Sequence, residues 1–203
     1  MNEHAEWLER IIPIARDAGR LLQERWRTGH TVRSKGYRDI VTEADVDAET
    51  LILGRLHDAF PEHATTSEEA GAEGRQTRIR WLVDPLDGTT NFSRNNPNFG
   101  VSIAAVADDE PLVGVVYDPL REICFAAYRG GGATLNGEPI HTSRVKHLER
   151  VVCSADWPRD PQRRSSAWAL AGELISEART LRCLGSAALN MAYVAAGWFD
   201  LYF

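Results

Sequence analysis

The chain has 203 residues, of which 43% are hydrophobic and 26% charged, and its formal net charge is −6. Such a length and composition are ordinary for a globular protein with a sizeable core, built as one domain or two small halves. The negative charge gives no electrostatic support for a nucleic-acid partner. No apolar run approaches the ~18 residues that a membrane span requires. We therefore expect neither a nucleic-acid nor a membrane partner.

The expected compartment is the cytoplasm. The N-terminal residues are charged and lack the apolar stretch of a signal peptide. Three cysteines, Cys124, Cys153 and Cys183, are scattered along the chain without a Cys-x-x-Cys motif. An odd, scattered set of cysteines favours reduced thiols.

A helix is predicted at the start of the chain. Apolar residues recur at three- and four-residue spacing from Trp7 to Trp26. Pro13 fits better near a helix start than inside a helix, so the first turn is predicted to be separate or kinked. A polar, mobile loop containing Lys35 is expected over residues 28–39.

A second helix is predicted over residues 43–60. Its apolar stripe ends at Pro61, which cannot continue a helix. Thr42 and Asp45 have the spacing of a capping box, with Asp in the place of the usual Glu. This spacing gives Asp45 a structural explanation that must be weighed against any catalytic one.

Short strands dominate the middle of the chain and alternate with helices near its end. A strand is expected just before Glu68, and others over residues 79–83, 99–107, 112–117, 123–128 and 133–135. The hairpin signal Asn136-Gly137 favours an antiparallel meander. Beyond residue 146 we predict a strand at 151–154, a helix at 161–178, a strand at 180–183, a helix at 186–196 and a strand from 199. This alternation divides the chain into an N-terminal α+β half, 1–145, and the start of a C-terminal α/β half, 146–203.

The stretch WLVDPLDGTTNF, residues 81–92, ends an apolar strand in two aspartates. Asp84 and Asp87 would repel each other and lose hydration at a buried strand end, so something must neutralise them. A plain Asp-Gly turn is one explanation. The other is Mg²⁺, which takes carboxylate and carbonyl oxygens as ligands, here two carboxylates and the Leu86 carbonyl.

The residues after the second aspartate are typical of a helix start. Gly88 permits close approach of a ligand, and the backbone amides at a helix N-terminus bind anions such as phosphate. Cation ligands and an anion cradle would then lie side by side, as metal-assisted phosphoryl transfer requires.

Two weaker acidic clusters precede this stretch. Glu68 and Glu69 form an adjacent pair, which by itself is usually a solvated loop. Glu43 and Asp45 lie at the predicted start of the second helix, where Asp45 has its capping explanation.

Taken together, four motifs resemble the inositol monophosphatase family. They are DIVTEAD (39–45), SEE (67–69), WLVDPLDGTTNF (81–92) and LGSAALNMAYVAAGWFD (184–200), and their order and spacing match over essentially the whole chain. The resemblance implies a layered αβαβα sandwich of the inositol monophosphatase/fructose-1,6-bisphosphatase type. It also implies a lithium-sensitive, Mg²⁺-dependent phosphomonoesterase with two or three ions, working as a homodimer.

The resemblance assigns roles to individual positions. Glu68, Asp84 and the Leu86 carbonyl would hold the first metal, and Asp84 and Asp87 the second. Thr89, with Asp45 behind it, would orient and deprotonate the attacking water. The phosphate would lie on the amides of Gly88 and Thr89, and the substrate would also contact Asp87 and Ala187.

The resemblance also implies residues that this sequence lacks. Family members carry a Trp-Asp motif, with a ligand of the second metal, beyond the position of Phe203, and an acidic substrate-binding residue just past it. The last residues, GWFDLYF, have the pattern of a buried strand that has only begun. We therefore expect that a C-terminal part is missing from this sequence.

The substrate is less well defined than the reaction. Inositol 1-phosphate is the first choice, as a small polyol phosphate; histidinol phosphate, fructose 1,6-bisphosphate and phosphoadenosine phosphate are alternatives within the same fold. The basic stretch WPRDPQRR, 157–164, would suit a second anionic group, although a solvated helix start is the more common explanation. Two other classes stay open: a non-catalytic phosphate-ligand-binding module, and a structural protein with an acidic turn.

Overall fold

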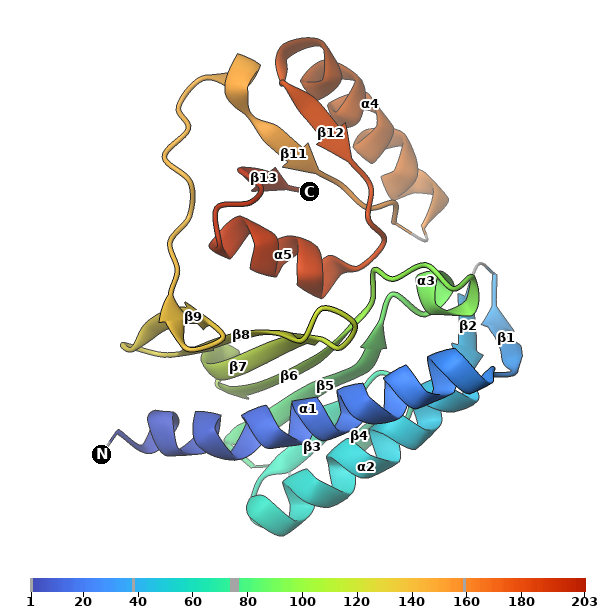
Figure 1. The fold of residues 1–203 in the computed structure, drawn as a ribbon, viewed down its shortest axis with the longest axis vertical. Helices are drawn as coiled ribbons and strands as arrows, with labels where there is room; N and C mark the ends of the chain where they lie inside the picture. Colours follow the sequence, from blue (N-terminus) through green and yellow to red (C-terminus); the bar gives the residue numbers. More distant parts are fainter. Residues whose placement is uncertain (1, 38, 74–76, 159) are drawn as a thin grey trace.

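The computed structural model describes residues 2–37, 39–73, 77–158 and 160–203. Helices and sheets alternate in layers, as Figure 1 shows. Helices α1 (Glu3–Thr28) and α2 (Glu43–Ala59) cover one face of a large sheet, and α5 (Ala187–Ala195) lies on its other face. A small sheet and α4 (Pro161–Glu177) follow beyond α5. The predicted αβαβα order is confirmed.

The large sheet has eight strands in the order β10-β9-β8-β7-β6-β5-β3-β4. The strands are β3 (Ala64–Ser67), β4 (Gly71–Glu73), β5 (Ile79–Asp87), β6 (Gly100–Ala107), β7 (Glu110–Asp118), β8 (Ile123–Tyr128), β9 (Gly132–Leu135) and β10 (Glu138–Pro139). From β5 to β10 each strand pairs antiparallel with the next, which confirms the predicted meander. By contrast, β3 pairs parallel with β5. The loop after β3 therefore lies near the Asp84 and Asp87 end of β5.

The small sheet is wholly parallel. After the 3-10 turn Leu148–Arg150, strand β11 (Val152–Ser154) pairs on one side with β12 (Thr180–Arg182) and on the other with β13 (Leu201–Tyr202). The alternation of strands and helices predicted beyond residue 146 is confirmed.

The main core lies between α1, α2 and the large sheet. Its largest fully buried side chains include Trp81 and Ile103 from the sheet and Ile11, Leu22 and Ile52 from the two helices. Each such side chain contributes roughly 1.5–3 kcal/mol of burial free energy. A second cluster, Phe125, Leu189, Ala192 and Tyr193, fixes α5 to the opposite face of the sheet.

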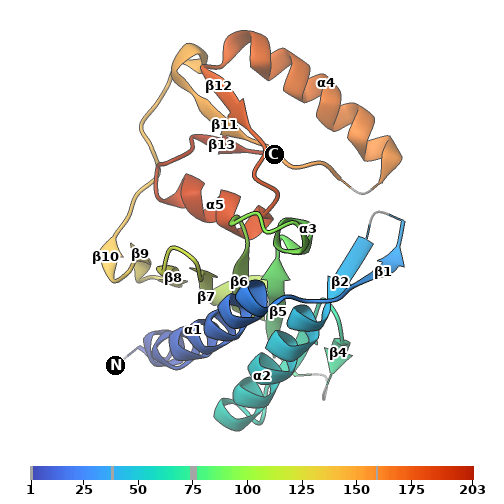
Figure 2. The same ribbon diagram turned by 45° about the vertical axis from the view of Figure 1, so that its right-hand side comes forward.

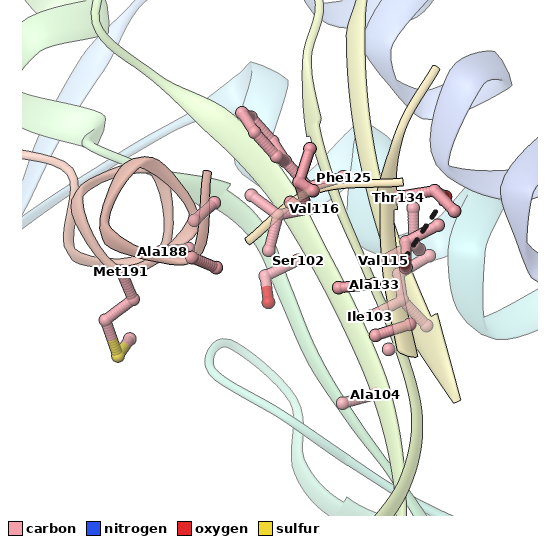
Figure 3. Close-up of a pocket in the computed structure, with 16 residues that line it drawn as sticks. Ser102, Ile103, Ala104, Val115, Val116, Phe125, Ala133, Thr134, Ala188 and Met191 are labelled. Carbon is pink, nitrogen blue, oxygen red and sulfur yellow. Dashed lines mark hydrogen bonds between the residues drawn. The ribbon is translucent and has the colours of Figure 1, made fainter. Parts of the chain in front are cut away.

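A cavity of about 260 Å³ lies beside this second cluster, between α5 and the strands β6 to β9 (Figure 3). Its only side-chain hydroxyls are those of Ser102 and Thr134, and its lining residues carry no ionisable side chain. The cavity is therefore unsuited to a phosphate group.

Three sequence expectations are wrong. The polar loop expected over 28–39 is instead the end of α1 followed by a hairpin, β1 (Val32–Gly36) and β2 (Asp39–Thr42); residue 38 lies outside the described part. All five residues of β1 are exposed, so no apolar alternation marks the strand. Pro13 lies inside one continuous helix rather than at a break. Finally, β5 continues past Val83 to Asp87.

The hairpin lies beside α3 (Thr89–Ser93), as the turned view in Figure 2 shows. Among the described residues, no helix is long and apolar enough to cross a membrane. All three cysteines are free, in agreement with the expectation of reduced thiols.

Candidate active site

The candidate site lies at the end of β5, where the strand pairing becomes irregular. Asp84 is paired with Ser102 of β6, and the next pair in register is Asp87 with Gly100. Between these two pairs, β5 has two residues, Pro85 and Leu86, where β6 has one, so β5 bulges there. Proline, which has no N–H to donate, is tolerated at such a bulge. The bulge turns the two aspartates away from a regular ladder.

Asp84 meets the carboxyl group of Glu68 from the loop after β3. Burial and the neighbouring carboxylates of Asp87 and Glu68 raise the pKa of Asp84 to about 8, and a hydrogen bond with Glu68 acts in the same direction. The adjacent Glu69 pairs with Lys35 of β1 at 2.7 Å between Nζ and Oε2. The charged form of the Asp84 carboxyl, which burial and its acidic neighbours disfavour, is one that a cation would stabilise.

The other aspartate, Asp87, points toward the N-terminus of α5. Its Oδ2 accepts hydrogen bonds from the Ser186 hydroxyl and from the Ala188 amide at 2.8 Å, and Oδ1 accepts from the Ala187 amide at 3.2 Å. Burial raises the pKa of Asp87, and these donors oppose the shift. Ala187, predicted to contact substrate, thus lies directly beside Asp87.

Asp45 makes two kinds of contact, one with each carboxylate oxygen. Oδ2 accepts from the backbone N–H and the hydroxyl of Thr42, at 2.8 and 2.6 Å, which is the predicted cap of α2. Oδ1 lies 3.0 Å from the Thr89 hydroxyl, which also lies 3.1 Å from the Leu86 carbonyl oxygen. Burial raises the pKa of Asp45. The structural and the catalytic interpretation of Asp45 are therefore compatible.

Gly88 is required by its surroundings. Its φ is +95°, and a Cβ there would lie 2.8 Å from the Asn98 carbonyl oxygen. It precedes the single short turn of α3, whose first amide groups have no intrahelical acceptor. Glycine is therefore required here by the positive φ and by the close approach of neighbouring backbone.

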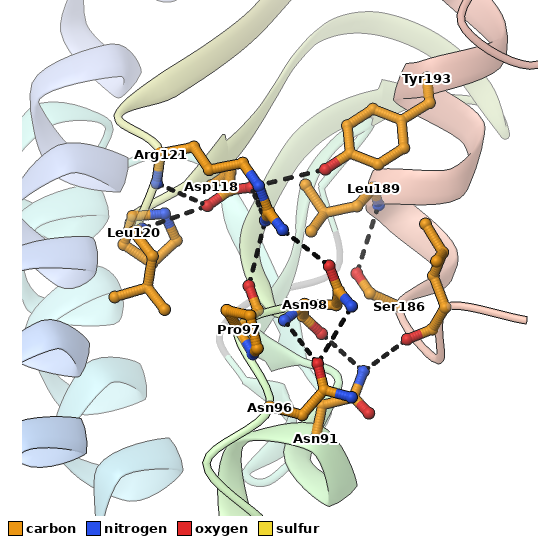
Figure 4. A network of polar contacts seen from close by, with 12 residues as sticks. Asn91, Asn96, Pro97, Asn98, Asp118, Leu120, Arg121, Ser186, Leu189 and Tyr193 are labelled. Carbon is orange, nitrogen blue, oxygen red and sulfur yellow. Dashed lines mark hydrogen bonds and ion pairs between the residues drawn. The ribbon is translucent and has the colours of Figure 1, made fainter.

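Several residues that the sequence patterns did not single out hold this region together. The Asn91 side chain donates to the carbonyl oxygens of Asn98 and Leu184, both at 2.7 Å, and so joins α3 to the segment before α5. Figure 4 shows the adjoining network, in which Arg121 contacts Asp118 at 2.6 Å and Asn98 at 2.9 Å. The contacts of Asn91 with Leu184 and of Arg121 with Asn98 join segments far apart in sequence, so no local motif predicts them.

The basic stretch 157–164 forms a helix start. Asp160 caps α4 by accepting from the Gln162 amide at 2.9 Å, and Arg164 donates to the Pro158 carbonyl oxygen at 2.7 Å. Arg159 lies outside the described residues. The common explanation of this stretch fits the structure better than a second anion site.

The chemistry of the candidate ligands suits Mg²⁺, although the side chains do not form a complete coordination shell. Glu68, Asp84 and the Leu86 carbonyl would supply the oxygen ligands that Mg²⁺ prefers. Within the described part of the chain, no three His, Cys, Asp or Glu side chains converge as a ready metal-binding group. Asp87 accepts its hydrogen bonds from the start of α5. Oδ1 of Asp87, which accepts one hydrogen bond, still has lone-pair capacity for a further partner, whereas Oδ2 already accepts two.

Comparison with known proteins gives the class. The sequence profile of the inositol monophosphatase family matches residues 3–203. The Nus factor SuhB of Escherichia coli (strain K12) is 39% identical over 196 residues, which are 95% of this chain and 73% of that protein. The chain therefore belongs to the inositol monophosphatase family, as its motifs predicted.

Solved structures agree with this assignment. The suhB protein of Bartonella henselae superposes with a TM-score of 0.91 at 34% identity, over 96% of this chain and 76% of that one. The inositol monophosphatase of Anabaena gives a TM-score of 0.87 at 32% identity, over 98% and 74% of the two chains. A Thermotoga maritima IMPase gives 0.88 at 36% identity, over 97% and 75%.

Proposed function

We propose that the protein is a Mg²⁺-dependent phosphomonoesterase that hydrolyses a small polyol phosphate, with inositol 1-phosphate first, by attack of water on phosphorus. The observation that carries the proposal is the Thr89 hydroxyl, 3.0 Å from a buried Asp45 oxygen and adjacent to the bulge that bears Asp84. A plain acidic turn needs no such pair. The proposal includes a cytoplasmic location and a homodimer.

The residues divide the work as follows. Glu68, Asp84 and the Leu86 carbonyl would hold a first ion, and Asp84 with Asp87 a second, with two or three ions in all. Bound Mg²⁺ would lower the pKa of water and stabilise charge on the phosphoryl oxygens. The amides of Gly88 and Thr89 would hold the phosphate, and Asp87 and Ala187 would contact the rest of the substrate.

Thr89 and Asp45 would accept the proton that the attacking water loses. A hydroxyl has one hydrogen, so when Thr89 donates to Asp45 its lone pairs face the attacking water. The proton of the water then passes to Thr89 as the hydroxyl proton passes to Asp45. Because burial raises the pKa of Asp45, this carboxylate is a better proton acceptor than an exposed one.

The test is phosphate release from inositol 1-phosphate with and without Mg²⁺. We expect Mg²⁺-dependent release that Asp84→Asn and Thr89→Val each reduce by about 100-fold or more. The first removes a charged metal ligand, and the second removes a positioned proton-transfer group, which contributes about 10²–10⁴-fold. Thr89→Ser, which keeps the hydroxyl, is the matched control and should retain most activity. Release that does not depend on Mg²⁺, or that survives Thr89→Val, would contradict the mechanism.

The substrate assignment is tested with a panel of esters. Histidinol phosphate, fructose 1,6-bisphosphate and phosphoadenosine phosphate are the alternatives within this family. A kcat/KM at least about tenfold higher for one of them, equal to 1.4 kcal/mol of transition-state stabilisation, would replace inositol 1-phosphate.

A second candidate function is a binding module that keeps the fold without hydrolysis. The E. coli relative bears the name Nus factor, which names no hydrolysis. This candidate predicts stabilisation by inorganic phosphate together with no release from any ester. Turnover of any ester would exclude it.

A further inference from the structure

A second buried carboxylate on α2 has no place in the motifs described so far. The Glu49 residue is 7% exposed and lies one helical turn after Asp45. Its Oε1 accepts hydrogen bonds from the Ser67 hydroxyl and from the backbone N–H groups of Glu69 and Ala70, at 3.1 and 2.9 Å. A buried carboxylate is costly unless it is hydrogen-bonded, so these three donors account for its presence.

The three donors enclose Glu68 from both sides along the chain. Ser67 precedes it, and Glu69 and Ala70 follow it. The backbone N–H of Glu68 itself donates to the Val83 carbonyl oxygen of β5 at 3.1 Å. The backbone of this loop is thus fixed to α2 and to β5 at once. The Glu68 carboxyl is left to meet Asp84.

Helix geometry connects this contact with the Thr89 contact. Residues four apart in a helix lie on the same face, so Asp45 and Glu49 project to the same side of α2. Asp45 contacts Thr89 after β5, and Glu49 contacts the loop after β3. One rigid face of α2 therefore sets the positions of both the proposed nucleophile-orienting hydroxyl and the proposed metal ligand.

We propose that Glu49 is a positioning residue for the cation site: it holds the 67–70 loop so that Glu68 meets Asp84. The proposal rests on the metal site of the proposed function and adds a residue that none of the assigned roles includes. Groups that orient metal ligands typically change metal affinity by 10–100-fold when they are removed.

The experiment measures the rise in melting temperature, Tm, with Mg²⁺ alone, and the Mg²⁺ concentration that gives half of the rise. Glu49→Leu removes the acceptor at similar size and should raise this concentration by about 10–100-fold. Glu49→Gln keeps an acceptor oxygen and should stay within about threefold, less than the effect of one lost hydrogen bond to a charged group. Asp58→Leu, an exposed carboxylate of the same helix, is the control and should leave the value unchanged.

Ser67→Ala covers the case in which Glu49→Leu does not fold. It removes one of the three donors and should raise the half-saturating Mg²⁺ concentration by roughly two- to tenfold, the equivalent of one hydrogen bond. A lower Tm with an unchanged Mg²⁺ concentration in these variants would overturn the positioning role, because a merely structural residue predicts that result. The rescue by Gln is the second signature.

Failure of the inference and failure of the proposed function give different results. If wild-type protein is stabilised by Mg²⁺ but releases no phosphate from any ester, the hydrolase proposal fails while the Glu49 comparison still decides the inference. If Mg²⁺ does not raise the Tm of the wild-type protein, the cation site and the role of Glu49 are overturned together.

Discussion

His63 illustrates at the scale of one residue how packing sets a protonation state. Its Nδ1 accepts a hydrogen bond from the Trp81 indole at 3.1 Å, and its ring stacks on Phe60. Burial lowers the pKa of His63, and the acidic residues Glu3 and Glu62 only partly offset this shift. The folded protein thus keeps the imidazole neutral at a pH where the unfolded chain already binds a proton.

This arrangement predicts a pH dependence of stability. The folded pKa of His63 lies below the unfolded value of about 6.5. The contribution of His63 to stability is therefore complete above pH 6.5 and is lost as the pH falls from that value through the folded pKa. Melting curves at pH 7.5 and 5.5 should show a larger loss of Tm for wild type than for His63→Gln, which keeps an acceptor for Trp81 but does not titrate. Equal losses would show that another group is responsible.

Individual residues also show how far the sequence predicts the site. The pairing of Asp45 with Thr42 follows from local spacing, and so was predicted. The contact of Asp87 with Ser186 joins residues 99 positions apart. Nothing in the turn Asp87-Gly88 encodes that contact, because it depends on how α5 packs against the sheet. Glu49 was missed for the same reason.

At the scale of elements, α5 lies between the two sheets and contacts both of them. Leu189 packs with Phe125 on the large sheet. On the other side of the helix Asn190, which is fully buried, accepts from the Ser154 hydroxyl of β11 and donates to Asp156 at 2.8 Å. The helix therefore has one apolar contact face and one hydrogen-bonded contact face.

Loss of the polar face should be costly. We expect Asn190→Leu to destabilise the protein by about 2–4 kcal/mol, because it leaves the buried Ser154 hydroxyl without its acceptor and removes one of the hydrogen bonds to Asp156, which keeps that of Tyr202. That corresponds to a Tm lower by roughly 5–15 °C for a chain of this size. Met191→Leu, a similar-sized change at a position 56% exposed, is the control and should have little effect. Equal Tm values for the two variants would contradict the role of Asn190.

The elements were predicted well where hydrophobic spacing was strong and poorly where it was absent. Strands β6 to β8 follow their apolar patterns closely. On α2 the bounds agree with the prediction, but Val46 of the expected stripe is 49% exposed, and the buried face includes Asp45 and Glu49. Strand β1 has every residue exposed, so its pairing with β2 is fixed by backbone hydrogen bonds that leave no mark in composition. Strand β5 extends through Pro85 by means of a bulge. The strand was predicted to end before this proline, because proline is rare inside a regular strand.

At the scale of the whole molecule, the layers interlock through contacts distant in sequence. Asp87 of the large sheet is bonded to the start of α5, and Asn91 of α3 to the segment before it. Residues 144–150, by contrast, are exposed and connect the two sheets along one side, as Figure 1 shows. The proposed division at 145/146 falls in this connection.

The exposed connection has a practical consequence: the covalent link there is expected to be dispensable once the protein has folded. Brief trypsin treatment should cut after Arg144 or Lys146, and the two fragments should stay together in size-exclusion chromatography because Asp87, Asn91 and the α5 core contacts lie across the cut. Separate elution of the fragments would refute this. If the fragments stay together, this connection is a natural point at which to split the protein. The two fragments could then be produced separately, and the candidate site would form only when they associate.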